Sequence, residues 1–584
     1  MQTESLRKHS SEFINRPFID SDTAAALNDA LVNWVGRSSG GLPGPRIVQA
    51  YLDWLINLSV APGRQLEILE GLIRSSFDLL KCALIGAEPC DDRRYKGEGW
   101  QKRPYAWLVQ AALHRDELAR IATEPLPGMD AHNAQLVRFY TQQLVDMLSP
   151  ANFALTNPEF VETTIAQRGR NLLRGARFAV EDLLRNVADI DLSPSDAFKV
   201  GENLATTPGK VIYRNDLMEL IQYSPTTENV YAEPILYVPA WIMKYYILDL
   251  SPGNSMMRWL VEQGHTVFAI SWKNPDKNDS HLTMEDYRSL GVSAALEVIG
   301  DIMPERKVHS VGYCVGGTLL MIAAAAMARD GDERLKSITL FAAQTDFTDA
   351  GELRLFIDEM TLYWLDQQMK RNGFLATKQM GGAFAALRAP DLLWQPMLRR
   401  YCLGEEGTDF DIMAWNADGT RMPYKMHSDY LRQLYLNNEL AQGKYTVGGA
   451  AVSIADISAP LYIVGTAADH IAPWKSVYKT RNLKKLGETT FCLTKGGHNA
   501  GIVSEPGRPR RSYSVGGWDQ HSAYQSAEVW QATAEHFEGS WWINWQAWLE
   551  RHSSPDRLAP PSLGAADKGH SILCDAPGTY VLQQ

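Results

Sequence analysis

The sequence predicts an α/β fold: a mostly parallel β-sheet with helices on both faces and an inserted cap subdomain. An α-helical domain precedes this fold in the sequence. Three observations support this prediction. Helical periodicity fills roughly the first 200 residues, short apolar runs then alternate with helical stretches, and more than a hundred residues separate two of these runs. We therefore expect a helical domain at 1–205 and a catalytic domain at 206–584.

Composition narrows the class of protein. The chain has 584 residues, of which 45% are hydrophobic and 21% charged, as is usual for globular proteins of two or three domains. The net charge of -11, without a long Lys/Arg run, argues against nucleic-acid binding. No apolar run is long enough to span a membrane, and the first residues lack signal-peptide features. We expect a cytoplasmic protein.

The six cysteines are scattered along the chain without metal-ligand or framework spacing. In a cytoplasm they would be reduced thiols. The sequence therefore predicts neither a metal site nor disulfides.

The elements of the helical domain are predicted from apolar residues at three- and four-residue spacing, in stretches such as AALNDALVNWVG and RFYTQQLVDMLSP. The strands of the sheet are predicted from runs that are apolar on both sides of any alternation, which is typical of parallel strands covered on both faces. These runs are 234–239, 266–272, 308–314, 337–343, 460–466 and 489–494.

The long interval after 337–343 is rich in Tyr and Trp. An unstructured loop of that length is uncommon inside a compact domain. We expect a cap subdomain at about 346–440, lying over the strand ends.

A cysteine stands between two glycines at the end of the third run, in HSVGYCVGGTL. Strand, tight turn and helix follow one another there, so Cys314 would lie at a helix N-terminus, where the helix dipole favours a thiolate. The N–H of Val315 would be the first oxyanion donor. The alternative is a buried structural cysteine in a glycine-rich turn.

In the α/β-hydrolase fold, the acid and the base follow the nucleophile in that order, after later strands. Asp469 follows the run at 460–466, and His498 follows the run at 489–494. We therefore predict the catalytic triad Cys314, Asp469 and His498. His470 is a rival base, but adjacent side chains diverge, so Asp469 would not orient it.

Two further groups of residues are candidates for the site. The loop after the first run offers the N–H of Trp241 or Ile242 as the second oxyanion donor. The segment EPGRPRRS, after His498, supplies Arg508, Arg510 and Arg511, either as cations for an anionic substrate or as a solvated basic loop.

Many motifs resemble those of the polyhydroxyalkanoate synthase family. They include GYCVGGT, DHIAPW, GGHNAG, KYYILDL, ENLATTPGKVIYRN, DRRYKGEGWQKRPYAWL and GSWWINWQAWL, and they extend from about residue 90 to the C-terminus. The length is most similar to class I, the single-subunit type that favours short-chain substrates. On this resemblance the triad residues take the family's catalytic roles.

The resemblance implies an acyltransferase that polymerises (R)-3-hydroxyacyl-CoA, such as 3-hydroxybutyryl-CoA, into polyester with release of CoA. It implies no cofactor beyond CoA as substrate carrier, a homodimer, and association with intracellular granules and their proteins. Trp415 matches a tryptophan of the family, and Tyr245, Asn499 and Arg510 are further candidates for substrate contacts.

The chain departs from the family near the site. Ala240 and Met243 replace a proline and an asparagine, and Asn499 replaces an isoleucine. These differences leave the triad intact and bear on acyl-length preference.

A thiol nucleophile suits acyl transfer between thioesters, because the acyl group keeps its transfer potential. Two alternatives remain open from the residues alone. One is a cysteine-dependent hydrolase or thioesterase of the same fold, and the other is a non-catalytic granule-associated scaffold.

Overall fold

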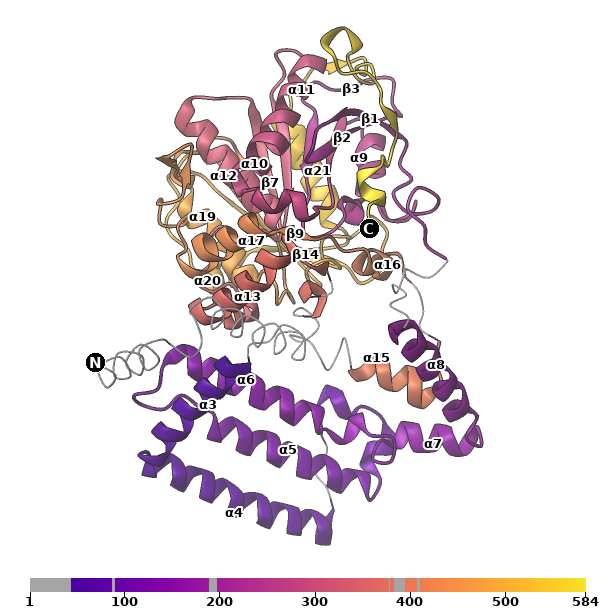
Figure 1. Ribbon diagram of the computed structural model, residues 1–584, viewed down its shortest axis with the longest axis vertical. Coiled ribbons are helices and arrows are strands. Elements are labelled where there is room, and N and C mark those ends of the chain that lie inside the picture. Colours follow the sequence, from indigo (N-terminus) through magenta and orange to yellow (C-terminus); the bar gives the residue numbers. More distant parts are fainter. Residues whose placement is uncertain (1–43, 87–89, 188–196, 378, 383–393, 407–409) are drawn as a thin grey trace, which may run out of the picture.

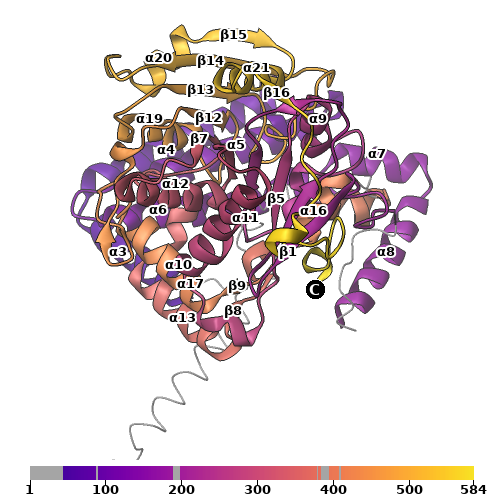
Figure 2. The same cartoon turned by 90° about the horizontal axis from the view of Figure 1, so that it is seen from above.

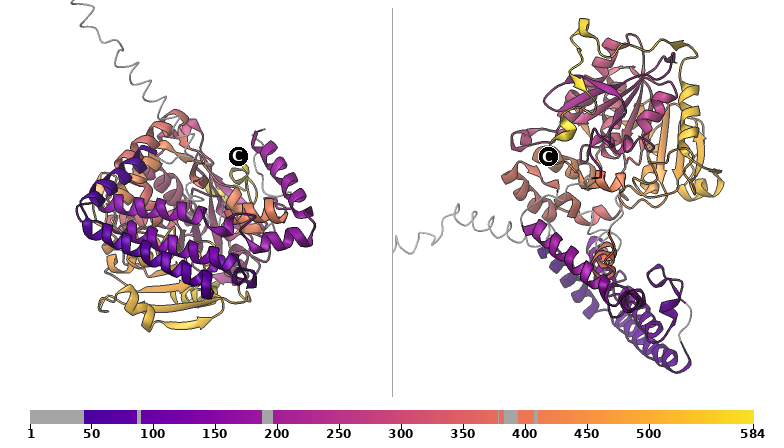
Figure 3. Two further views of the ribbon diagram at one scale, coloured as in Figure 1. Left: turned by 90° about the horizontal axis from the view of Figure 1, so that it is seen from below. Right: turned by 90° about the vertical axis from the view of Figure 1, so that its right-hand side faces the viewer.

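The computed structural model describes residues 44–86, 90–187, 197–377, 379–382, 394–406 and 410–584. Two regions are stacked along the longest axis of the molecule: a layer of helices from the N-terminal part of the chain, and a domain built around a β-sheet (Figure 1). Helices of the cap lie between the sheet and the N-terminal layer (Figures 1 and 3).

The sheet has eleven strands in the order β15-β14-β13-β12-β7-β6-β4-β5-β2-β1-β17. Its centre is parallel, from β5 to β13, and both edges are antiparallel. The strands are β1 (Gly209–Arg214), β2 (Met218–Tyr223), β4 (Ile235–Val238), β5 (Val267–Trp272), β6 (Val308–Tyr313), β7 (Leu335–Phe341), β12 (Leu461–Thr466), β13 (Thr489–Thr494), β14 (Ser512–Trp518), β15 (Glu535–Glu538) and β17 (Cys574–Asp575).

All six predicted strands are present, and they form the parallel centre of the sheet. Every residue of β4, β5, β6, β12 and β13 is buried, as expected for strands covered on both faces. The antiparallel edge strands were not predicted. The α/β-hydrolase fold is thus confirmed, with a larger sheet than the sequence indicated.

Helices cover both faces of the sheet (Figure 2). On one face, α11 (Ala294–Ile302) and α12 (Val315–Asp330) belong to one buried cluster. On the other face, α9 (Met256–Glu262) and α21 (Trp541–His552) belong to a second cluster, to which α21 contributes four buried tryptophans. Helices α18 (Trp474–Tyr478), α19 (Thr480–Leu483) and α20 (Ala527–Thr533) complete this domain.

The insertion between β7 and β12 forms the cap. Its main elements are η7 (Glu352–Phe356), α13 (Glu359–Asn372), β8 (Phe374–Leu375), α15 (Gln395–Leu398), η9 (Arg399–Leu403), α16 (Asp411–Ala417), β9 (Met422–Pro423), α17 (Tyr424–Tyr430) and η10 (Leu431–Leu436). The π-helical segment η10 continues α17 directly, and such segments are frequent at functional sites.

The N-terminal region consists of α3 (Gly44–Ser59), α4 (Pro62–Ile85), α5 (Tyr105–Ala122), α6 (Ala131–Met147), α7 (Pro158–Ala166) and α8 (Arg170–Val187). The predicted boundary at 205/206 lies between α8 and β1. None of the helices in the described ranges combines the length and the apolar character that a membrane span requires.

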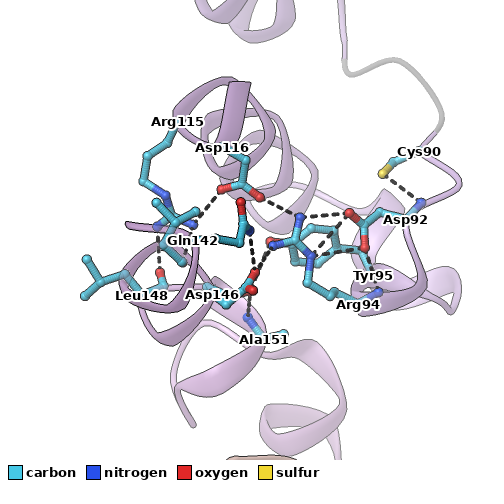
Figure 4. Close-up of polar contacts among 12 residues, drawn as sticks. Cys90, Asp92, Arg94, Tyr95, Arg115, Asp116, Gln142, Asp146, Leu148 and Ala151 are labelled. Carbon is cyan, nitrogen blue, oxygen red and sulfur yellow. Dashed lines mark hydrogen bonds and ion pairs between the residues drawn. The ribbon is translucent and has the colours of Figure 1, made fainter. Parts of the chain in front are cut away.

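Arg94 joins the loop before α5 to α5 and α6 (Figure 4). Its guanidinium contacts Asp92 at 2.8 Å, Asp116 at 2.6 Å and Asp146 at 3.1 Å. Burial would lower the pKa of Arg94, but the hydrogen bonds to Asp92 and Asp116 outweigh it and raise the pKa further above its ordinary value. The cluster therefore holds these helices together as a charged network.

The helical region contacts the cap at both of its ends. Arg46 of α3 pairs with Asp358, the N-cap residue of α13, at 2.7 Å. Burial raises the pKa of Asp358, but hydrogen bonds from His132 and Thr361 and the pair with Arg46 outweigh burial and lower it below 3.8.

At the other end, the cap segment α15–η9 lies beside α7 and α8 (Figure 1). Arg400 pairs there with Asp182 at 2.8 Å, and Asn171 donates to the carbonyl of Cys402 at 2.7 Å. The cap is therefore packed between the N-terminal helical region and the domain that contains the sheet. The aromatic composition of the insertion alone did not predict this position.

Candidate active site

Cys314 stands at the turn between β6 and α12, as the sequence predicts. Its backbone has φ 53° and ψ -126°, a left-handed conformation that is unusual for a residue with a side chain. Its N–H donates to the carbonyl of Phe341 on the neighbouring strand at 2.9 Å. The strained turn presents the sulfur at the carboxyl edge of the sheet, next to the positive end of α12.

Three glycines allow this turn to pack closely. A Cβ on Gly312 would lie 2.4 Å from the Cα of Gly317, and a Cβ on Gly317 would lie 2.5 Å from the Cβ of Ala343. A Cβ on Gly316 would lie 2.4 Å from the carbonyl oxygen of Pro239. Gly316 therefore lets the start of α12 touch the loop after β4.

Asp469 lies in the turn after β12, and all its polar contacts are made within the protein. Its Oδ1 accepts the N–H groups of Ile471 and Ala472, both at 2.9 Å. Its Oδ2 accepts the hydroxyl of Thr466 and the ring nitrogen of His498, both at 2.8 Å.

These contacts decide the charge of the carboxyl group. Burial raises the pKa of Asp469, but the nearby imidazolium of His498 and the hydrogen bonds outweigh it and lower the pKa below 3.8. Asp469 is therefore an ionised, fully oriented acid.

His498 lies in the turn after β13, with its Nδ1 on Asp469. Burial would lower the pKa of His498, but the charge of Asp469 and the sulfur of Cys314 outweigh burial and raise the pKa well above 6.5. The three predicted triad residues thus meet in the order of a hydrolase triad, and the acid orients the base.

Tyr313 contacts both the ring of His498 and the neighbouring residue Asn499. The ring of Tyr313 stacks on the imidazole with 5.7 Å between centroids. The hydroxyl of Tyr313 donates to Oδ1 of Asn499 at 2.5 Å. Asn499 therefore connects the turn that carries the base to the strand that carries the nucleophile, and it is not among the residues that line the cavity over Cys314.

The two predicted donor positions for an oxyanion lie close to Cys314. Val315 is the first residue of α12, so its N–H has no partner within the helix. Val315 and Ile242 line the same cavity as Cys314. Trp241 does not line it: its ring packs between those of Tyr287 and Tyr430. Of the two candidates for the second donor, Ile242 is the one that borders the cavity.

An apolar cavity of about 160 Å³ lies over Cys314. The cap supplies much of its wall, from η7, α13, α17 and η10. The lining residues that the later sections use are Phe356, Thr361, His427, Tyr430, Leu431 and Tyr435. A cap over the nucleophile was predicted, but these residues were not named as its site residues.

Trp415 and Tyr245 lie in the core, and the cavity lining does not include them. The indole N–H of Trp415 donates to the carbonyl of Lys244 at 2.8 Å. The expected contact of Trp415 with substrate in this cavity is therefore corrected: its indole holds the loop that carries Ile242. Tyr245 begins the short helix η4 (Tyr245–Leu248) on that loop and is 2% exposed.

The remaining candidates lie outside the cavity. Arg510 is exposed in the segment before β14, and Arg508 pairs with Glu505 at 3.0 Å. His470 does not line the cavity either, although it follows Asp469 directly. In the part of the chain that the structure describes, no group of three metal-ligating side chains is arranged around a common point.

Cavity residues that the sequence did not single out as a group are His427, Tyr430 and Tyr435. Their spacing of three and five residues places them on one side of α17 and η10. The aromatic richness of the insertion was a signal for Tyr430 and Tyr435, whereas a single histidine in a helical stretch gave none.

Two family models match the chain. Residues 91–260 match the N-terminal region of poly-beta-hydroxybutyrate polymerase (PhaC), and residues 233–505 match the alpha/beta hydrolase fold. The first match covers most of the N-terminal helical region, and the second covers the central strands of the sheet and the turns that carry Cys314, Asp469 and His498.

Curated relatives cover nearly the whole chain. A protein of Rhizobium meliloti named poly(3-hydroxyalkanoate) polymerase subunit PhaC is 39% identical, over 96% of this chain and 93% of its own. A poly(3-hydroxyalkanoate) polymerase of Methylorubrum extorquens is 40% identical over 84% of this chain and 81% of its own. The PhaC subunit of Cupriavidus necator is 36% identical over 93% of this chain and 91% of its own. The chain therefore belongs to the poly(3-hydroxyalkanoate) polymerase family of acyltransferases, within the α/β-hydrolase superfamily.

Proposed function

We propose that this chain polymerises (R)-3-hydroxyacyl groups from CoA thioesters into polyester and releases CoA, through an acyl thioester on Cys314. The observation that carries the proposal is a thiol at the apex of a strained turn, inside an apolar cavity, with the pair of His498 and Asp469 behind it. The relatives named as polymerases support the same activity.

In the first step, His498 takes the thiol proton and Cys314 attacks the carbonyl carbon of the CoA thioester. The N–H groups of Val315 and Ile242 stabilise the negative oxygen of the tetrahedral intermediate. The bond between that carbon and the CoA sulfur then breaks, and His498 returns its proton to the CoA thiolate. Asp469 stabilises the imidazolium in between.

In the second step, His498 takes the proton from the 3-hydroxyl of another acyl unit, and the resulting oxygen attacks the thioester on Cys314. An oxygen ester forms, the bond between the acyl carbon and the sulfur of Cys314 breaks, and His498 returns the proton to the Cys314 thiolate, so the chain is one unit longer and the enzyme is restored. A serine in place of Cys314 would hold the acyl group as an oxygen ester, so transfer to an alcohol would lose the driving force that the thioester supplies.

The cavity suits short acyl groups and the exclusion of water. Its volume is about 160 Å³, and aromatic side chains from the cap, among them Phe356 and Tyr430, form part of the wall. Water competes with the hydroxyl nucleophile, so an apolar cap favours chain growth over hydrolysis. We propose 3-hydroxybutyryl-CoA and similar short units as substrates.

The reaction as proposed needs no cofactor, because the CoA thioester itself carries the activated acyl group. Arg510 and the neighbouring basic residues would meet the phosphates of CoA from the solvent side. Association with polyester granules and their proteins, and a homodimer, are part of the proposal and rest on the resemblance to the family.

The test follows both products of 3-hydroxybutyryl-CoA, namely free CoA and precipitated polymer. Cys314→Ala is expected to abolish CoA release and to keep the fold, and Cys574→Ser, at the edge of the sheet, is the matched control. Mass spectrometry should find acyl groups on Cys314. Free hydroxy acid without polymer would indicate a thioesterase, and a wild-type protein that is never acylated would indicate a scaffold.

A pair of histidine variants tests the base. His498→Ala is expected to suppress thiol alkylation and chain growth, because His498 is the ring that Asp469 orients. His470→Ala is expected to retain turnover. The opposite pattern would assign the base to His470.

A further inference from the structure

Two polar side chains in the wall of the apolar cavity have a buried atom without a hydrogen-bond partner among the described residues: His427 at Nδ1 and Thr361 at Oγ1. His427, on α17, lines the cavity and is only 3% exposed. Its ring nitrogen Nδ1 is buried, and among the described residues it has no hydrogen-bond partner. Because a buried polar group without a partner reduces stability, such a group in a cavity wall is expected to find its partner in a ligand.

His427 is uncharged in this environment. Burial lowers its pKa to about 4, and the charge of Asp366 opposes the shift only in part. A neutral imidazole has one N–H donor and one acceptor lone pair. It therefore matches a hydroxyl group, which both donates and accepts, and offers no charge to the phosphates of CoA.

His427 lies on the same wall as residues that are close to the nucleophile. Its ring is 6.3 Å from that of Tyr430, one helical turn further along the chain. Cys314 lines the same cavity as both residues, and burial, then the charges of Tyr435 and Cys314, raise the pKa of Tyr430. His427, Tyr430 and the nucleophile therefore border one cavity.

We propose that His427 binds the 3-hydroxyl group of the acyl unit in the cavity, and so selects 3-hydroxyacyl thioesters over unsubstituted ones. The proposal rests on the function proposed above, since it takes Cys314 as the acylated residue. His427 is then a specificity residue, separate from the triad.

The competing explanation is a structural one. Asp366 also has a buried oxygen, Oδ1, without a partner among the described residues, while its Oδ2 contacts Arg432 at 3.0 Å. A water molecule between Asp366 and His427 would satisfy both atoms without a ligand. In that case His427 would contribute to stability and not to selectivity.

The experiment measures the first acylation of Cys314 by 3-hydroxybutyryl-CoA and by butyryl-CoA, which lacks only the 3-hydroxyl. Rapid quenching and intact-protein mass spectrometry give both rates, and their ratio is the selectivity. His427→Phe keeps an aromatic ring and removes both nitrogens. It is expected to reduce the selectivity about tenfold, equal to 1.4 kcal/mol, while alkylation of Cys314 by iodoacetamide stays unchanged.

Two further variants complete the design. His427→Gln keeps a donor and an acceptor, and it is expected to restore part of the selectivity. His265→Phe replaces another buried histidine whose pKa burial lowers to about 4, but which bonds Gln546 at 2.8 Å outside the cavity. It should lower the melting temperature and leave the selectivity unchanged.

The outcomes separate the proposals. His427→Phe with an equal or higher melting temperature and lost selectivity supports the hydroxyl site. A selectivity within twofold of the wild type, or an equal slowing of both thioesters, overturns it. If neither thioester acylates the wild-type protein, the proposed function itself is refuted. This result differs from both outcomes described for His427→Phe.

Discussion

Gly316 is the position where the smallest change should disturb the oxyanion site most. A Cβ at this residue would lie 2.4 Å from the carbonyl oxygen of Pro239 and 2.5 Å from that of Val238. Both contacts are to backbone atoms, so no side chain is able to rotate away. The φ of Gly316 is not in the left-handed region, so Gly316→Ala changes only this contact.

The magnitude follows from the distances. Ordinary contact begins near 3.4 Å, so the loop after β4 and the start of α12 would have to separate by about 1 Å. That movement carries the N–H of Ile242 away from the N–H of Val315. A misplacement of this size costs about 100-fold in rate, and the loss of one oxyanion donor costs about 10²–10³-fold. The added methyl group also destabilises the fold by about 1–3 kcal/mol.

The assay is the first acylation of Cys314 by 3-hydroxybutyryl-CoA, combined with thermal unfolding. We expect Gly316→Ala to acylate at least 100 times more slowly, at a temperature where it remains folded. Gly300→Ala, in α11, is the matched control because its Cβ meets no atom within 4 Å. It should stabilise the fold by about 0.5–1 kcal/mol and leave the rate unchanged. A Gly316→Ala protein within threefold of the wild-type rate would refute the reasoning.

Three other changes test the triad, the loop and the cap. Asp469→Asn keeps an oxygen that accepts the two backbone N–H groups, but it turns an amide N–H toward His498. The rate of acylation should therefore fall about 10⁴-fold, with little change in melting temperature. Trp415→Phe loses the bond that holds the loop after β4, so it should slow acylation and lower stability by about 1–3 kcal/mol without changing the ratio of free acid to polymer. Arg46→Met should destabilise the fold by about 3 kcal/mol at pH 7. Because the pKa of Asp358 is lowered, this deficit is present above pH 3.8 and shrinks as the pH falls further, as thermal unfolding against pH would show.

The central strands were predictable and the edge strands were not, for a physical reason. Strands covered on both faces need apolar residues at nearly every position, so their composition alone marks them. The antiparallel strands lack such runs: β2 is buried at every position but includes Glu219 and Gln222, β14 is largely half-buried, and β15 has exposed glutamates at both ends. Sequences of this kind resemble loops and surface helices as much as strands.

The triad was predictable because its information is local. Cys314, Asp469 and His498 each follow a recognisable strand, and parallel strands end at the same edge of the sheet. The cavity wall depends instead on how the cap packs, which no local pattern encodes. Trp415 shows the difference. The resemblance to the family made it a candidate for substrate contacts, but tertiary packing directs its indole N–H to the carbonyl of Lys244.

The cap also connects the reaction to a region that lies far from the nucleophile. Asp358 pairs with Arg46 of the helical layer, and its neighbours Phe356, Ile357 and Thr361 all line the cavity over the sulfur. One side of that wall is therefore held by Arg46, which lies 312 positions before Asp358 in the sequence. Breaking the ion pair between Arg46 and Asp358 removes a constraint on this wall of the cavity and leaves the contacts of the triad unchanged. The helical layer thus contributes to the shape of the acyl cavity, whatever else it binds.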